Sequence, residues 1–435
     1  MYKKELIRKL QTRDAVIGIV GMGYVGLPLA LRFSEVGYKV IGFENDVHKV
    51  NTLNAGKSCI KYIPDQKVAD MVASGSYVTS DYSDSANADA LIICVPTPLD
   101  KNMGPDLSYI MGSVDSIAPY LCRGQVLTLE STTYPGTTRD KILPTIKKRG
   151  FDSGDDFFLV YSPEREDPGN ADFSTQTIPK ICGGHTPSCL EVGIALYEQV
   201  VDQVVPVSST EAAELTKLLE NIHRAVNIGL VNEMKILSDR MDIDIYEVIR
   251  AAATKPFGFT AYYPGPGLGG HCIPIDPFYL TWKAKEYGLH TKFIELAGEI
   301  NNSMPAYVID KVTRALNDNG KAVNGARVTL IGVSYKKNID DVRETPASEI
   351  VRELLSRGAD VAFIDPHVKE FSGEAEDTFC IGATEFSEDV IRDSDCIVVV
   401  TDHDDIDYDL IAQHAQVIVD SRGRYDPKQV NVVAS

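Results

Sequence analysis

The sequence predicts an α/β protein with two doubly wound parallel-sheet domains joined by a long central helix. Short apolar runs without polar alternation recur through residues 1–205 and again through residues 316–435, and such runs are typical of strands buried on both faces of a parallel sheet. Between these regions, residues 209–241 carry apolar side chains at helical spacing with no Gly-Pro break. We therefore expect three domains: 1–205, 206–315 and 316–435.

The expected elements follow in chain order. Strands are expected within residues 15–21, 39–43, 88–95, 125–130 and 157–161 of the first domain and within residues 326–331, 359–364, 395–400 and 415–420 of the last. The long helix of the middle domain is expected to begin with Ser208, Ser209 or Thr210 as its N-cap, since a hydroxyl there can accept a free backbone N–H.

Composition argues against several classes of protein. The net charge of −19, from 43 Lys and Arg against 62 Asp and Glu, opposes binding to nucleic acid or to an acidic membrane surface. The eight cysteines are scattered without a CxxC pair, so neither a metal site nor a disulfide framework is expected. The apolar runs are too short to cross a bilayer and the N-terminus has no apolar signal-peptide core, so we expect a cytoplasmic protein.

A glycine-rich turn follows the first expected strand. Gly21, Gly23 and Gly26 form G-x-G-x-x-G ahead of an apolar-periodic helix, and Glu44 ends the second expected strand. This is the pattern of a Rossmann-like dinucleotide site: a tight turn, a close approach of backbone N–H groups to a pyrophosphate, and close helix packing. A carboxylate at position 44 would accept from ribose hydroxyls and repel a 2′-phosphate, which favours NAD over NADP. FAD is the alternative cofactor for this motif, and no further flavin-binding motif supports it.

Four more residues are assigned to the cofactor side of the site. Tyr24 and Val25 lie inside the glycine motif, and Thr97 and Thr132 each follow a later expected strand. Open α/β sheets bind their ligands at the carboxyl ends of the strands, where these threonines are expected.

Five polar residues suggest the chemistry. Glu164 follows an apolar strand, Lys217 and Asn221 lie four apart on one face of the long helix, and Cys272 and Asp276 share a loop rich in glycine and proline. A nucleophilic thiol can capture an aldehyde as a thiohemiacetal, and oxidation of that adduct gives a thioester that water hydrolyses. Together with NAD, these residues predict the oxidation of an alcohol to an acid in two hydride transfers.

Eight motifs, in order and spanning nearly the whole chain, resemble the UDP-glucose/UDP-mannose dehydrogenase family. They are GMGYVGLPLA, VPTP, ESTTYPGTT, YSPEREDPGN, IPKICGG, AELTKLLENIHRAVNIGLVNE, PGPGLGGHCIPIDPFYL and GVSYKKNIDDVRETP. The resemblance implies an NAD-dependent four-electron oxidation of the C6 hydroxymethyl group of a nucleotide sugar to a carboxylate.

The resemblance also implies roles for the reactive residues. Cys272 would be the nucleophile, while Lys217 and Asn221 would hold or deprotonate the reacting oxygen and stabilise the oxyanion. Asp276 and Glu164, with Thr132, would position and activate the hydrolytic water. The base of the first oxidation stays open between Lys217 and a water held by Asp276.

The resemblance implies that the last domain binds the UDP part, and its lack of a G-x-G-x-x-G motif is consistent with this. Lys336 and Arg422 would contact the nucleotide sugar, and Arg343 would lie nearer the NAD. Other residues implied to contact the substrate are Glu164, Arg165, Lys217, Asn221 and Gly269.

The form of the SPEREDPGN motif and His271 before the cysteine resemble the branch of the family that acts on N-acetylhexosamines. UDP-N-acetylglucosamine is therefore the first expected substrate, UDP-N-acetylmannosamine the second and UDP-glucose the third, with a product like the precursors of bacterial O-antigen or capsule. The long helix predicts a homodimer or higher homo-oligomer.

Two rival functions remain open at this point. One is a two-electron dehydrogenase of the 3-hydroxyacid type, in which the cysteine loop would be structural. The other is an NAD-dependent regulatory or binding protein without catalysis.

Overall fold

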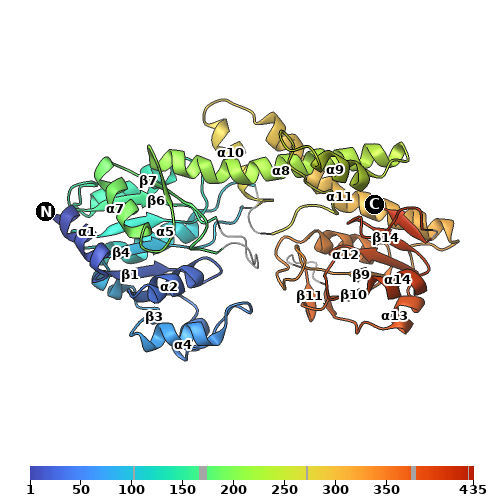
Figure 1. Cartoon of the computed structure of the whole chain (residues 1–435), viewed down its shortest axis with the longest axis horizontal. Helices are drawn as coiled ribbons and strands as arrows, with labels where there is room; N and C mark the ends of the chain where they lie inside the picture. The colour runs from blue at the N-terminus through green and yellow to red at the C-terminus, as the bar shows by residue number, and fades with distance from the viewer. Residues whose placement is uncertain (101–102, 166–173, 271–272, 374–378, 430) are drawn as a thin grey trace. The chain divides into compact units, whose positions relative to one another are not determined.

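The computed structural model describes residues 1–435 except 101–102, 166–173, 271–272, 374–378 and 430, so Cys272 lies outside the described residues. The chain divides into two units, one of residues 1–220 and 282–289 and the other of residues 221–281 and 290–435 (Figure 1). One boundary falls inside the long central helix. The division into three domains therefore stays a prediction.

The first unit is built on an eight-stranded sheet of order β3-β2-β1-β4-β5-β6-β7-β8. Its strands are β1 (Val16–Val20), β2 (Lys39–Phe43), β3 (Tyr77–Thr79), β4 (Ala90–Ile93), β5 (Val126–Leu129), β6 (Phe158–Tyr161), β7 (Lys180–Gly184) and β8 (Val204–Val207). The first six run parallel in the order 3-2-1-4-5-6, which is the Rossmann arrangement. Strand β7 pairs antiparallel with β6, which corrects the expectation of a wholly parallel sheet.

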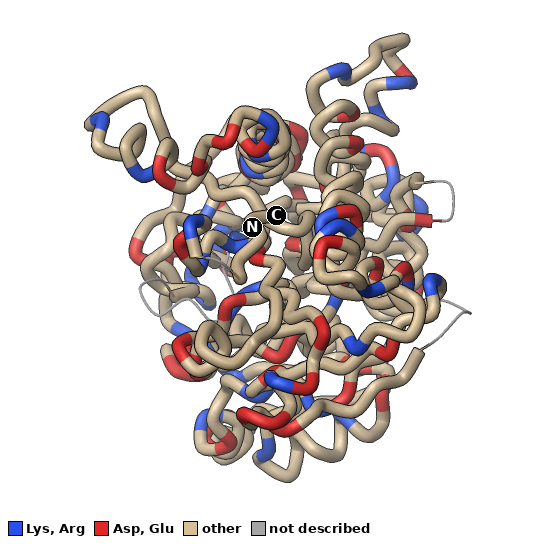
Figure 2. The backbone as a smooth tube through the Cα atoms, turned by 90° about the vertical axis from the view of Figure 1, so that its right-hand side faces the viewer, with Lys and Arg blue, Asp and Glu red and all other residues tan. Residues whose placement is uncertain are grey.

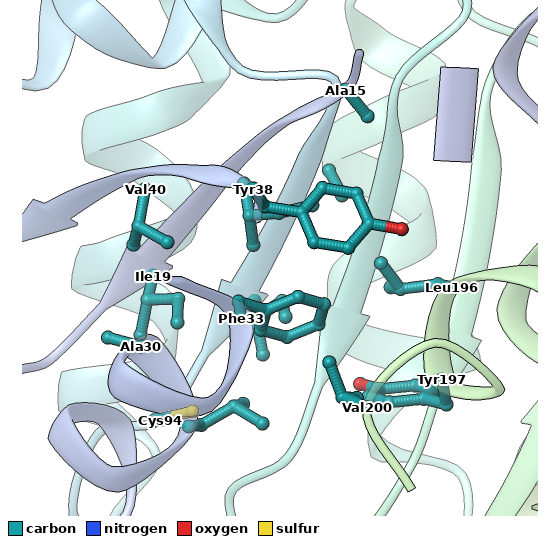
Figure 3. Close-up of a cluster of buried hydrophobic side chains, with 14 of the residues drawn as sticks. Ala15, Ile19, Ala30, Phe33, Tyr38, Val40, Cys94, Leu196, Tyr197 and Val200 are labelled. Carbon is teal, nitrogen blue, oxygen red and sulfur yellow. The ribbon is translucent and has the colours of Figure 1, made fainter. Parts of the chain in front are cut away.

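Helices cover this sheet and bury the apolar runs. They are α1 (Tyr2–Thr12), α2 (Gly26–Glu35), α3 (Val47–Asn54), α4 (Asp65–Ala73), α5 (Ser108–Ile117), α6 (Leu143–Lys148) and α7 (Pro187–Tyr197), with the short helical turns η1 (Tyr82–Asn87), η2 (Ala118–Tyr120) and η3 (Thr138–Ile142). Every residue of β4, β5 and β6 is buried, as expected for strands covered on both faces. Figure 3 shows part of one core cluster, in which Phe33 and Tyr38 lie beside Leu196 and Tyr197.

The second unit holds a five-stranded parallel sheet of order β10-β9-β13-β14-β15. The strands are β9 (Arg327–Ile331), β10 (Asp360–Ile364), β13 (Cys396–Val399), β14 (Ile418–Asp420) and β15 (Val432–Ala434), and β11 (Glu370–Ser372) pairs separately with β12 (Cys380–Gly382). Its helices are α12 (Pro346–Ser356), α13 (Glu388–Asp393) and α14 (Tyr408–His414). In chain order the sheet reads 2-1-3-4-5, the second common doubly wound arrangement. The prediction of a second Rossmann-like domain is thus confirmed.

The long helix is α8 (Thr210–Arg240). The Ser209 hydroxyl accepts the N–H of Ala212 at 3.1 Å and so caps its start, which is one of the three caps expected. The remaining helices are α9 (Ile245–Ala253), α10 (Asp276–Lys285) and α11 (Lys292–Asp318). Among the described residues, no helix combines the length and the apolar character that a membrane span requires. Figure 2 shows acidic positions distributed along the backbone with basic ones between them.

Candidate functional site

The three glycines of the turn between β1 and α2 differ in the space around them. Gly21 has φ +92°, and a Cβ on it would lie 2.7 Å from the Cys94 carbonyl oxygen. A Cβ on Gly26 would lie 1.8 Å from the Gly21 oxygen, so the helix can begin this close only with glycine. A Cβ on Gly23, in contrast, would have no atom within 4 Å. The turn therefore fits a dinucleotide, with open space at the position expected to face the pyrophosphate.

Glu44 lies directly after β2 and is held against the glycine turn. One carboxylate oxygen accepts the N–H of Met22 at 3.3 Å, and the other accepts the N–H groups of Asn45 and Asp46 at 2.9 and 3.1 Å. Lys49 lies 3.8 Å away. These contacts fix the carboxylate at the end of the strand beside β1, where the ribose of a dinucleotide is bound in this arrangement. Tyr24 and Val25 belong to the same turn.

The two threonines follow parallel strands at the same edge of the sheet. Thr97 comes after β4 and is buried, and Thr132 comes after β5 and is half-buried. The turn after Thr132 is tied to α8 by Glu214, which sequence reasoning missed. Its carboxylate accepts the N–H of Gly136 at 2.6 Å and both the N–H and the hydroxyl of Thr138, at 2.9 and 2.7 Å.

Lys217 follows Glu214 by one turn of α8. Its side chain is buried, with 8 % of the residue exposed, although the sequence alone would place most helical lysines on the solvated face. Within the same unit, Glu164 and Arg165 follow β6. Arg165 forms an ion pair with Glu220 of α8 at 2.7 Å and also donates to the Pro179 carbonyl. This pairing joins the segment after β6 to the long helix.

Asn221 and Asp276, 55 residues apart in the chain, are in contact. The side-chain amide of Asn221, on α8, donates to the carboxylate of Asp276, the first residue of α10, and both side chains are buried. The four-residue spacing puts Lys217 and Asn221 on the same face of α8. Two of the residues expected to handle the reacting oxygen and the water therefore share one hydrogen bond.

The glycines before Cys272 approach the loop after β9. A Cβ on Gly269 would lie 2.6 Å from the Cβ of Tyr335, and a Cβ on Gly270, whose φ is +83°, would lie 2.9 Å from the Tyr335 ring. The N–H of Gly270 donates to the Arg343 carbonyl at 3.1 Å. Gly269, expected at the substrate, is thus required by packing against the segment that carries Lys336 and Arg343.

The loop after β9 lies where the strand order of the second sheet reverses, between β9 and β13. In doubly wound sheets this is the place where ligands bind. Lys336 is half-buried there, and the guanidinium of Arg343 pairs with Asp341 through three hydrogen bonds of 2.9, 3.1 and 2.6 Å. Arg343 belongs to the second unit and the glycine turn to the first, so its place near NAD stays a prediction.

His403 and Asp365, two buried side chains that no sequence motif marks, stabilise this loop. His403 Nδ1 accepts the N–H of Asn338 at 3.0 Å, so the ring proton lies on Nε2, which donates to Asp365 at 3.0 Å. Ser334 shares that same Nε2 at 3.3 Å. Because Ser334 and Asp365 meet one nitrogen rather than two, the group is not a hydrolytic triad.

Arg422 follows β14 and is packed under the loop that leads to Cys272. It donates from Nε to the Val400 carbonyl at 2.7 Å, and a Cβ on Gly265 would lie 2.7 Å from its guanidinium. Burial lowers the pKa of Arg422, against the attraction of nearby Asp402 and Asp420. It is therefore not a surface cation, and its guanidinium is held beside the segment that carries Gly269.

A second buried pair missed by sequence reasoning lies behind Glu164. Lys180, at the start of β7, donates to Glu130 at 2.9 Å, and both side chains are almost fully buried. Lysine within a strand and glutamate at a strand end are each unremarkable in sequence, and only the antiparallel pairing of β6 with β7 brings them together.

Comparison with known proteins identifies three matching domains of one family. Residues 15–201, 211–303 and 329–427 match the NAD binding, central and UDP binding domains of the UDP-glucose/GDP-mannose dehydrogenase family. The family expected from the sequence is thus confirmed, with GDP-mannose rather than UDP-mannose in its description.

Individual relatives match over most of the chain. The chain is 36 % identical over 358 residues to a UDP-N-acetyl-D-glucosamine 6-dehydrogenase of Pseudomonas aeruginosa, covering 82 % of this chain and 84 % of that protein. It is 34 % identical over 392 residues to a UDP-N-acetyl-D-mannosamine dehydrogenase of Methanococcus maripaludis, covering 89 % and 86 %. The solved structure of a UDP-D-ManNAc dehydrogenase from Pyrococcus horikoshii matches with a TM-score of 0.87 and 30 % identity, covering 96 % and 98 %.

Proposed function

The chain belongs to the UDP-glucose/GDP-mannose dehydrogenase family, and from that premise we propose that it oxidises the C6 hydroxymethyl group of a UDP-N-acetylhexosamine to a carboxylate. The observation that carries the proposal is the buried hydrogen bond between Asn221 and Asp276. It brings together an amide that can stabilise an oxyanion and a carboxylate that can activate a water molecule. A two-electron 3-hydroxyacid dehydrogenase has no need of that carboxylate or of Cys272.

The cofactor of this chain is NAD. Gly21, Gly23 and Gly26 would hold its pyrophosphate and Glu44 its ribose, with Thr97 and Thr132 at the neighbouring strand ends. When bound, NAD accepts one hydride in each of the two oxidations. The balance is one alcohol, two NAD⁺ and one water giving one carboxylate, two NADH and three protons.

The protein's own residues would do the remaining work. Lys217 or a water held by Asp276 removes the hydroxyl proton, and Asn221 donates to the oxygen as charge develops. The Cys272 thiolate adds to the aldehyde carbon and leaves again when water attacks the thioester. Glu164 and Asp276, with Thr132, position and activate that water. Lys336, Arg422 and Arg343 would neutralise the pyrophosphate charges of the two nucleotides, and Arg165 and Gly269 would line the sugar side.

UDP-N-acetylglucosamine is the proposed substrate, and its uronic acid would serve as a precursor of a bacterial surface polysaccharide. The test is NADH formation with UDP-N-acetylglucosamine, UDP-N-acetylmannosamine, UDP-glucose and the galacto epimers at equal concentrations. We expect the highest kcat/KM with UDP-N-acetylglucosamine and two NADH per sugar. A higher kcat/KM with the manno epimer would reassign the substrate, and one NADH per sugar would reject the four-electron reaction.

Replacing the thiol tests the covalent step. Cys272→Ser should form the hemiacetal poorly and stop after one NADH, since a neutral hydroxyl is a much weaker nucleophile than a thiolate. The measurement is NADH per enzyme-bound sugar by absorbance, together with the aldehyde trapped by hydroxylamine. If Cys272→Ala turns over at the wild-type rate, the thioester route is wrong.

A further inference from the structure

We infer that Lys180 is a positioning residue that holds the Ser-Pro-Glu end of β6, and with it Glu164, in place for hydrolysis of the thioester. This inference rests on the proposed function, because it assigns Lys180 to one half of that reaction. Lys180 is the charged residue of the IPKICGG segment, to which the proposed function gives no role.

The ammonium group of Lys180 bridges two strand ends of the first sheet. It donates to the Glu130 carboxylate, directly after β5, at 2.9 Å, and contacts the Pro163 carbonyl, after β6, at 3.5 Å. Pro163 immediately precedes Glu164, whose N–H donates to the Glu130 carbonyl at 3.5 Å. The position from which Glu164 leaves the sheet is therefore set by contacts to residues on both sides of β6.

Lys180 interacts electrostatically with two carboxylates. Burial alone would lower the pKa of Lys180, but the negative charges of Glu130 and Glu164 outweigh burial and raise it. The pKa of Glu130 is raised by burial and by the charge of Glu164, against the attraction of Lys180. The buried ammonium group of Lys180 thus offsets the negative charges of both Glu130 and Glu164. Without it, Glu130 and Glu164 would repel each other across the end of the sheet.

Three further groups near Lys180 carry no positive charge. Tyr197, on α7, donates to the second oxygen of Glu130 at 2.7 Å, and its ring lies under the ammonium, 4.9 Å from centroid to Nζ. Cys94 and Cys182 are the nearby thiols, and burial raises the pKa of each, so both stay protonated at neutral pH. Figure 3 shows Tyr197 and Cys94 within the apolar cluster under the sheet. Lys180 is the cation of this group, and its charge interacts with that of Glu164.

A purely structural role would not require this arrangement. A buried ion pair is generally no more stabilising than apolar side chains of the same volume, because both charges lose their hydration. The backbone here is already fixed by the pairing of β7 with β8 and by the hydrogen bond of 2.7 Å from the Ser162 hydroxyl to the Ile181 carbonyl. The charge of Lys180 is thus better explained by its electrostatic interaction with Glu164 and by its contact with the Pro163 carbonyl, directly before Glu164.

The test uses the full-length enzyme and two independent variants that remove the charge. Glu130→Gln/Lys180→Met removes both buried charges together, so neither partner is left uncompensated. Lys180→Gln keeps a hydrogen-bond donor of similar reach without the charge. Tyr197→Phe is the matched control, because it removes a hydrogen bond to Glu130 from the same cluster and leaves Lys180 in place. Far-UV circular dichroism and the unfolding midpoint show which variants fold.

The measurements separate the two halves of the reaction. Wild type is assayed first, and two NADH per sugar with loss of turnover in Cys272→Ala establishes the proposed function independently of Lys180. In each charge-removing variant that folds, we expect kcat to fall on the order of tenfold to a hundredfold, within what one positioned acid-base group contributes. KM for the UDP-sugar should fall together with kcat, so that kcat/KM stays near that of wild type, with a burst of two NADH per active site. Intact-mass spectrometry should then detect the acyl group on the enzyme.

Tyr197→Phe should show neither the loss in kcat nor the acyl-enzyme. If a folded charge-removing variant turns over like wild type, or slows without accumulating the acyl-enzyme, Lys180 does not act on hydrolysis and the inference is overturned. If wild type itself yields one NADH per sugar, it is the proposed function that fails.

Discussion

Glu214 joins α8 to the turn after β5 through a carboxylate with no exposed surface. Three donors from Gly136 and Thr138 favour its ionised form, but burial acts in the opposite direction and raises its pKa from the ordinary 4.5 to about 7. Lys217 lies one helical turn further along α8. The protonation state of Glu214 therefore affects how this proposed catalytic residue is positioned.

The raised pKa predicts a pH dependence of stability. A carboxyl group whose pKa is higher in the folded than in the unfolded protein contributes stability that is complete below 4.5 and is lost as the pH rises through about 7. The shift corresponds to about 3 kcal/mol as an upper bound. Glu214→Gln cannot titrate, so the unfolding midpoint of wild type should fall relative to that of the variant between pH 5 and pH 8, as measured by calorimetry. A difference that is constant over this range would contradict the raised pKa.

Single residues could be predicted where they belong to a local sequence motif. Gly21 and Glu44 directly follow strands and Gly26 begins α2, all within one spaced motif, so their places in the structure follow from local sequence. Glu214, Lys180 and Glu130 were missed because a buried acid or lysine is identified by its partner, and the partners lie 76, 50 and 50 residues away. Only the folded chain brings them together.

At the scale of elements, the apolar runs of β1, β4 and β5 and the long helix α8 were predicted from periodicity. Strand β7 was missed because its sequence, KICGG, contains a lysine and two glycines. Those glycines are required by close packing, since a Cβ on Gly184 would lie 2.2 Å from the Leu190 nitrogen and one on Gly183 would lie 2.3 Å from the Ser209 oxygen. Close packing against α7 and the start of α8 therefore requires glycine at two positions where a strand usually carries apolar side chains, and this hides the strand in the sequence.

The turn from β1 to α2 allows folding and cofactor binding to be separated by two matched substitutions. Gly26→Ala should destabilise the protein strongly, because its Cβ would lie 1.8 Å from a backbone oxygen. Gly23→Ala should leave the unfolding midpoint near that of wild type, because the added methyl meets no protein atom, but should weaken NAD binding about tenfold or more by occupying the space for the pyrophosphate. Calorimetric unfolding measures the first effect and titration with NAD measures the second. If Gly23→Ala binds NAD as tightly as wild type, the pyrophosphate does not lie at Gly23.

At the scale of the whole molecule, α8 leaves an apolar stripe in solvent. Leu230, Met234 and Leu237 of α8 and Met241, directly after its end, are all exposed, at successive spacings of four, three and four residues. That spacing places them on one side of a helix, as in the seam of two packed helices. Isolated exposed apolar residues are common on monomers, whereas a stripe of this kind marks an interaction surface.

We therefore expect a homodimer formed through α8, with a mass in solution twice the 47.7 kDa of one chain. Leu230→Glu/Leu237→Glu should shift the protein to monomer, because facing carboxylates repel each other and lose hydration when two stripes meet. The matched control is Leu355→Glu, an exposed leucine of similar size on α12 outside this stripe, which should leave the mass unchanged. Light scattering coupled to size-exclusion chromatography measures all three. A wild-type monomer would reject the dimer, and a dimer that persists in the double variant would place its interface on another surface.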